Sequence, residues 1–67
     1  MRPISKTELA LSYMPALSPH SAVNRLMAWI TQCQPLFTQL LQTGYRKTQK
    51  QFSGQQHALI LQYLGEP

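Results

Sequence analysis

Acid–base chemistry needs carboxylates that converge on one site, and this sequence has few to offer. Its only acidic residues are Glu8 and Glu66, and it contains no aspartate. A carboxylate pair, a Ser-His-Asp relay or a hard-metal site depends on acidic side chains held close together. Glu8 and Glu66 lie near opposite ends of the chain. We therefore expect that the protein is not an enzyme and takes no small-molecule substrate.

Soft-metal ligands are also scarce. Cys33 is the only cysteine, and with His20 and His57 it supplies at most three ligands of unrelated spacing, whereas a structural zinc site uses four. We expect no metal and no cofactor. A single cysteine cannot form an intramolecular disulfide, which favours a reducing compartment and predicts that Cys33 is a buried thiol.

Polar and basic residues match another chemistry, the recognition of nucleic acid. Arginine pairs with guanine and asparagine with adenine in the major groove, and lysine and arginine bind phosphates. Four residues are the expected base contacts: His20, Ser21, Asn24 and Arg25. Four cations are the expected phosphate contacts: Arg46, Lys47, Lys50 and Lys6. The net charge of +4 and the pI near 9.7 have the sign that phosphate binding requires.

Two helices must position the expected base contacts. The run Ser5-Lys6-Thr7-Glu8 matches a capping box and predicts a first helix over about residues 6–14, which Pro15 ends. Ser18 followed by Pro19 is typical of an N-cap and the first helical position, so a second helix should cover about residues 19–33. Its predicted apolar face consists of Ala22, Val23, Leu26, Met27, Trp29, Ile30 and Cys33.

Two shorter helices follow. The first should cover about residues 35–42, with Gly44 as its left-handed stop. We expect residues 45–51 to form an exposed loop, in which Tyr45 either stacks on a base or covers the core. Ser53 and Gln56 match a second capping box and predict a helix over about residues 54–64. No segment predicts a strand, so the fold class is all-α, a bundle of about four short helices.

The length and composition fit a single small domain over residues 1–67. Apolar residues make up 43% of the chain, which is enough for one thin core. No apolar stretch approaches the 18 or so residues that a membrane span needs. We expect a soluble, cytoplasmic protein that does not bind a membrane.

The first two helices, with a short turn between them and a polar start to the second, match a helix-turn-helix unit. Leu9, Ala10 and Tyr13 have the spacing with which the first helix of such a unit packs on the second. The turn would be about three residues longer than in the compact form, and Met14 or Pro15 stands where a glycine is common.

The assembled residues resemble a family of short uncharacterised Bacteroidales proteins that is catalogued as a domain of unknown function. The resemblance covers nearly the whole chain, and its most specific parts are Gly44-Tyr45 and the run Leu64-Gly65-Glu66-Pro67. The other matching residues are Lys6-Thr7-Glu8-Leu9-Ala10, Tyr13, Pro15, Ala22, Leu26, Trp29-Ile30, Leu36, Leu40, Phe52, Gln56 and Ile60. The resemblance implies a bacterial, stand-alone domain of helix-turn-helix type and transfers no site residue.

Two hypotheses about function follow. In the first, the protein is a DNA-binding or transcription-associated domain. Its second helix reads the major groove, and its basic loop contacts phosphates. Its partners are double-stranded DNA and, where the site has paired halves, a second copy of the chain. In the second, it is a protein-interaction adaptor that docks through apolar surface around Leu17, Met27 or Tyr63 and has no nucleic-acid role. Binding should depend steeply on salt only in the first.

Overall fold

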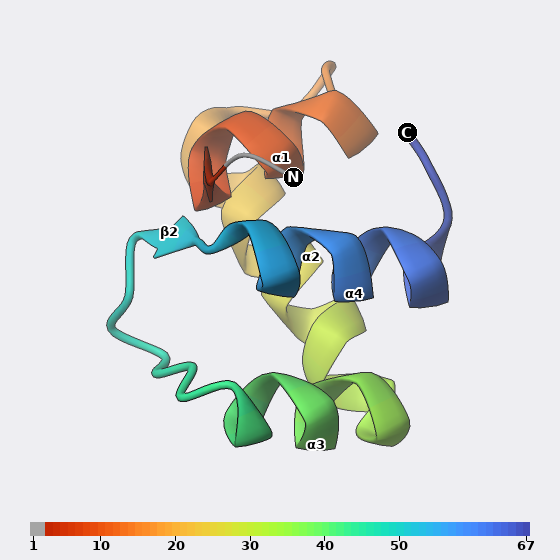
Figure 1. Cartoon of the computed structure of the whole chain (residues 1–67). Coiled ribbons are helices and arrows are strands. Elements are labelled where there is room, and N and C mark those ends of the chain that lie inside the picture. Colours follow the sequence, from red (N-terminus) through yellow and green to blue (C-terminus); the bar gives the residue numbers. More distant parts are fainter. Residues whose placement is uncertain (1–2) are drawn as a thin grey trace.

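The computed structural model describes residues 3–67 and shows four helices with one pair of very short strands (Figure 1). The elements in chain order are β1 (Ile4–Ser5), α1 (Lys6–Tyr13), α2 (Pro19–Gln32), α3 (Gln34–Gln42), β2 (Gln51–Phe52) and α4 (Gly54–Leu64). The fold is mostly α, which confirms the predicted class. The observed helix ends lie within one residue of the predicted ones.

Serine caps start the first and last helices as the sequence predicts. The Ser5 Oγ accepts from the Glu8 amide at 3.0 Å, although only this half of the predicted capping box is present at α1. At α4 the box is complete, because the Ser53 Oγ accepts from the Gln56 amide and the Gln56 side chain accepts from the Ser53 amide. These bonds satisfy amides that a helix start otherwise leaves without partners.

Gly44 ends α3 as predicted, with a φ of 88° in the left-handed region. The turn brings the Gly44 amide to the Leu41 carbonyl at 3.1 Å and the Tyr45 amide to the Leu40 carbonyl at 3.2 Å. This is the pattern of a Schellman motif. It reverses the chain so that Tyr45 enters the core instead of pointing into solvent.

The segment between α3 and α4 differs from the exposed loop that the sequence predicts. Its end forms β2, which pairs antiparallel with β1 so that Ile4 faces Phe52 and Ser5 faces Gln51. Tyr45 and Phe52 are both buried and their rings stack with centroids 5.8 Å apart. Both strands have only two residues, too few for an alternating pattern, so the sequence gives no strand signal.

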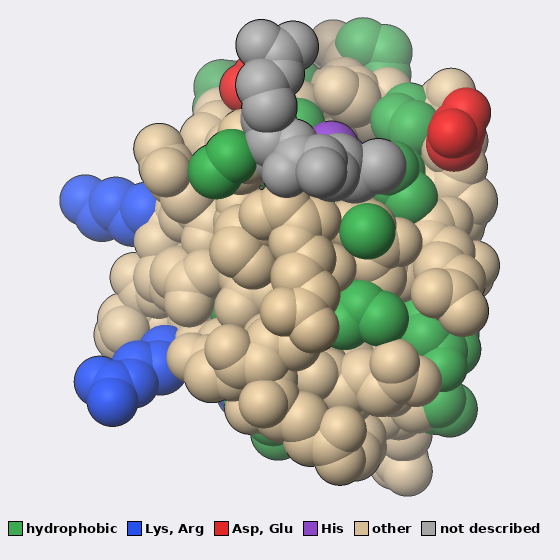
Figure 2. All heavy atoms as spheres, in the orientation of Figure 1, with side chains coloured by type: hydrophobic (Ala, Val, Ile, Leu, Met, Phe, Trp, Pro, Cys, Tyr) green, Lys and Arg blue, Asp and Glu red, His purple; other side chains and the backbone are tan. Residues whose placement is uncertain are grey.

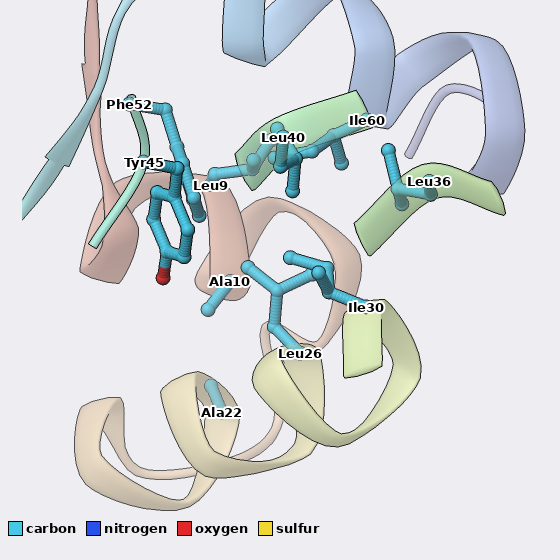
Figure 3. Close-up of a cluster of buried hydrophobic side chains, with 10 residues drawn as sticks. All are labelled: Leu9, Ala10, Ala22, Leu26, Ile30, Leu36, Leu40, Tyr45, Phe52 and Ile60. Carbon is cyan, nitrogen blue, oxygen red and sulfur yellow. The ribbon is translucent and has the colours of Figure 1, made fainter. Parts of the chain in front are cut away.

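All four helices contribute to one core (Figure 3). In Figure 1, α4 lies between α1 above and α3 below, and α2 runs behind them. Ala10 of α1 and Ala22 of α2 are fully buried, and small side chains at both positions allow the two helices to approach closely. The core residues are Leu9, Ala10, Ala22, Leu26, Ile30, Leu36, Leu40, Tyr45, Phe52 and Ile60.

The Phe52 ring should be one of the main stabilising side chains, although the sequence places it at the end of a loop. Phe52→Ala should lower the free energy of unfolding by about 3–5 kcal/mol, since it removes a fully buried aromatic ring and leaves a cavity. Leu41→Ala is the control, because that side chain is 50% exposed, and it should cost less than about 1 kcal/mol. Urea unfolding of both variants measures the difference, and equal losses would contradict this account of the core.

Candidate functional site

The four expected base contacts occupy the exposed first half of α2. His20, Ser21, Asn24 and Arg25 are all exposed. The helix begins as predicted, with Ser18 as N-cap and Pro19 at the first helical position. The Ser18 Oγ accepts a hydrogen bond from the Ser21 amide at 3.4 Å. The Asn24 amide nitrogen lies 3.2 Å from the His20 Nε2, which links these two side chains along the helix.

The same half of α2 borders a shallow groove of about 610 Å³. Ser21, Asn24 and Arg25 line it, so the structure brings together three of the four expected base contacts. The remaining lining residues are Leu17, Ala28, Trp29 and Gln32. Sequence reasoning did not predict this groove, whose lining comes from α2 and from Leu17 in the turn before it.

Trp29 lies in this groove, and its predicted place in the core is wrong. The side chain is 37% exposed and meets the Tyr13 ring edge to face, with centroids 6.0 Å apart. The buried stripe of α2 consists of Ala22, Leu26 and Ile30. Trp29 stands at the edge of that stripe, and α1 ends at Tyr13 before it can cover the whole indole.

Three expected phosphate contacts lie on one short segment, residues 46–50, which we call the basic segment. Arg46, Lys47 and Lys50 are exposed there. Lys and Arg side chains project from the left edge of Figure 2, where Figure 1 places this part of the chain, and the acidic side chains in view lie at the top. The segment therefore presents positive charge away from the acids.

Hydrogen bonds fix the backbone of the basic segment. The Gln49 amide donates to the Arg46 carbonyl at 3.0 Å and closes a turn. The Lys6 amide donates to the Lys50 carbonyl at 3.0 Å, and the Lys6 ammonium donates to the Lys47 carbonyl at 3.0 Å. The Gln49 side chain donates to that of Gln56 on α4 at 2.7 Å. The exposed cations thus extend from a fixed main chain.

Lys6 itself is not available as a phosphate contact, because its side chain is only 8% exposed. The ammonium lies 4.9 Å from the centroid of the Tyr45 ring and 5.8 Å from that of Phe52, which are cation–π distances. Burial lowers the pKa of Lys6 below its usual value. Lys6 therefore holds the basic segment in place instead of joining its surface.

Tyr45 is also unavailable for stacking on a base, since it is 3% exposed. Its hydroxyl lies 3.5 Å from the sulfur of Met27 on α2. This contact shows that the basic segment begins on the Met27 side of α2.

Arg25 lies two positions before Met27, or about 200° around the helix, so Arg25 and the basic segment lie on opposite sides of α2. His20 lies about two turns before Met27, on the same side as the segment.

Within residues 3–67, the structure shows neither a cluster of metal-ligating side chains nor a helix that could span a membrane. No three metal-ligating side chains from His, Cys, Asp and Glu lie together in this part of the chain. Cys33 is half-buried, and it is more accessible than the buried thiol that the sequence predicts. None of the helices described is long and apolar enough to cross a bilayer.

Comparison with known proteins identifies a family but no relative with a described role. A family model described as a domain of unknown function, DUF4248, matches residues 1–67. No curated protein and no solved structure matches the chain.

The buried Tyr45 hydroxyl should make the protein less stable in alkali. Burial raises the pKa of Tyr45 from 10.0 to about 12. The unfolded chain therefore loses this proton first, and stability falls as the pH rises above 10. At pH 11 the loss should be on the order of 1 kcal/mol. Urea unfolding at pH 8 and pH 11 should show this loss in the parent protein and a smaller one in Tyr45→Phe; equal losses would place the hydroxyl in water.

Proposed function

The chain belongs to the DUF4248 family, a domain of unknown function, and we propose that it binds double-stranded DNA. In this proposal α1 and α2 form a helix-turn-helix-like unit. The exposed start of α2 faces base edges, and the basic segment contacts phosphates. DNA binding would place the protein in the cytoplasm of a bacterial cell.

The observation that carries the proposal is the basic segment. Its three exposed cations extend from a backbone that Lys6, Gln49 and Gln56 hold by hydrogen bonds. A fixed main chain leaves only side-chain freedom to be lost when phosphate binds. The segment itself contains no acid, and the chain as a whole has a net charge of +4. Phosphate contacts of this kind release counterions and give affinity that does not depend on sequence.

The start of α2 supplies side chains for reading bases on the same side. His20 lies on the same side of α2 as Met27, the residue that the Tyr45 hydroxyl contacts. Asn24 is joined to His20 by a hydrogen bond between their side chains. In this proposal one duplex contacts these two residues and the basic segment together. Arg25 lies furthest from that side, so His20 and Asn24 are the proposed base contacts nearest the basic segment, and Ser21 and Arg25 line the same groove as Asn24.

The adaptor hypothesis finds less support at two of its three expected residues. Met27 is half-buried against the core and contacts the Tyr45 hydroxyl. Tyr63 is 36% exposed, but its hydroxyl accepts a hydrogen bond from Gln39 of α3. Only Leu17 borders an open hollow, the groove beside Trp29. DNA binding is therefore the function that we propose.

Removal of two cations from the basic segment should change how DNA binding depends on salt. Fluorescence anisotropy of a labelled mixed-sequence duplex, titrated between 50 and 200 mM salt, gives the slope of log affinity against log salt. Lys47→Ala with Lys50→Ala should reduce that slope by about two, because two phosphate contacts are lost.

The matched control is Arg25→Ala, which removes an exposed cation from the opposite side of α2 and should leave the slope unchanged. If the double variant keeps the parent slope, the basic segment does not bind phosphate. Absence of any binding at 50 mM salt would overturn the proposal as a whole.

Asn24 should contribute sequence preference and little general affinity. A side chain that pairs with a base contributes about 1–3 kcal/mol of discrimination, whereas phosphate contacts contribute none. Selection from random duplexes should yield a preferred site for the parent protein, and Asn24→Ala should lose the preference at one position. Failure of the parent protein to select any site would remove base reading from the proposal.

A further inference from the structure

The shallow groove follows the exposed face of α2 and extends past the residues proposed to face bases. Ser21, Asn24 and Arg25 line its first part. Ala28, Trp29 and Gln32 line its second part, and Leu17 closes one end.

The exposed indole of Trp29 marks the apolar part of the groove. Tyr13 holds one edge of the ring, and the rest meets solvent together with Leu17 and Ala28. Tryptophan is enriched among the residues that dominate binding at protein interfaces, because it buries a large apolar area with little loss of side-chain freedom. The groove therefore fits an apolar side chain beside this ring.

The only charge in the groove is that of Arg25. Arg25 lies one turn before Trp29, so the two side chains are neighbours on the helix surface. None of the lining residues is acidic, and the two acids of the chain lie elsewhere, on α1 and near the C-terminal end. Ser21, Asn24 and Gln32 add hydrogen-bonding groups of the kind that bind a peptide backbone.

We propose that this groove is a docking site for an acidic peptide segment of a partner protein, with a carboxylate on Arg25 and an adjacent large apolar side chain on Trp29. Charge complementarity identifies the occupant, because a carboxylate forms paired hydrogen bonds with a guanidinium. A second copy of this chain is a poor occupant, since it carries six cations and only two acids. The groove shares Ser21 and Asn24 with the surface proposed for DNA, and the variants below distinguish the two proposals.

A random peptide library displayed on phage and selected on the whole protein supplies the probe. We expect the selected peptides to share an Asp or Glu next to a large apolar residue. Trp29 is the only tryptophan in the chain, so its fluorescence reports directly on the groove when a synthetic copy of a selected peptide is added. Arg25→Gln should weaken binding of that peptide by about tenfold or more, because a charge-assisted hydrogen bond is lost.

Two further variants make the test specific. Lys47→Gln removes the same charge from the basic segment and should change peptide affinity by less than about twofold. Ala28→Lys fills the groove at an exposed helical position and should abolish peptide binding while duplex binding persists. Circular dichroism confirms that each variant is folded.

The proposal is overturned if no peptide is enriched, if enriched peptides lack acidic residues, or if Lys47→Gln weakens peptide binding as much as Arg25→Gln. It is also overturned if Arg25→Gln weakens duplex binding as strongly as peptide binding, because the groove would then belong to the DNA surface. Gel filtration of the protein alone distinguishes self-association, and a dimer lost in Ala28→Lys would assign the groove to a second copy.

Discussion

The Lys6 ammonium lies against the rings of Tyr45 and Phe52 and donates to the carbonyl of Lys47. This buried cation joins the start of α1 to Lys47, 41 residues further along the chain. Its side chain is removed from water, so its charge must be stabilised by the rings and the carbonyl. The backbone amide of the same residue binds the Lys50 carbonyl. One residue thus fixes the basic segment at two points, and the direction of the exposed cations depends on it.

Much of the fold could be predicted because its signals are local. Ser53 and Gln56 mark the start of α4 by a pattern that lies within four residues, and the observed hydrogen bonds complete it. Gly44 marks the end of α3, since a left-handed residue there needs no information from elsewhere. Proline and serine placed the start of α2 in the same way. Helix ends follow from such short patterns, and these four helices account for most of the chain.

The parts that sequence reasoning missed depend on contacts between distant residues. Tyr45 and Phe52 flank a polar stretch, and the sequence left open whether Tyr45 covers the core. Pairing of β2 with β1 and contact with Lys6 bury both rings. Lys6 looks like any surface cation in sequence, and only the two rings across the fold explain its burial. Trp29 fits the apolar period of α2, but its exposure is decided by where α1 stops. A helical period assigns a residue to a broad face and does not determine which neighbour covers the edge of that face.

The sequence supplied candidate residues for DNA contact, and only the structure shows how those residues are arranged around α2. His20 lies on the Met27 side of α2, where the basic segment begins, and Arg25 lies on the opposite side. Asn24 lies between them, since it is hydrogen-bonded to His20 and lines the groove with Arg25 and Trp29. The most direct test of this arrangement is an NMR titration of isotope-labelled protein with a short duplex at 50 mM salt. The account predicts that the largest shift changes occur at Arg46, Lys47 and Lys50, with smaller changes at His20 and Asn24. Changes centred on Arg25, Trp29 and Gln32, with the basic segment unaffected, would contradict it.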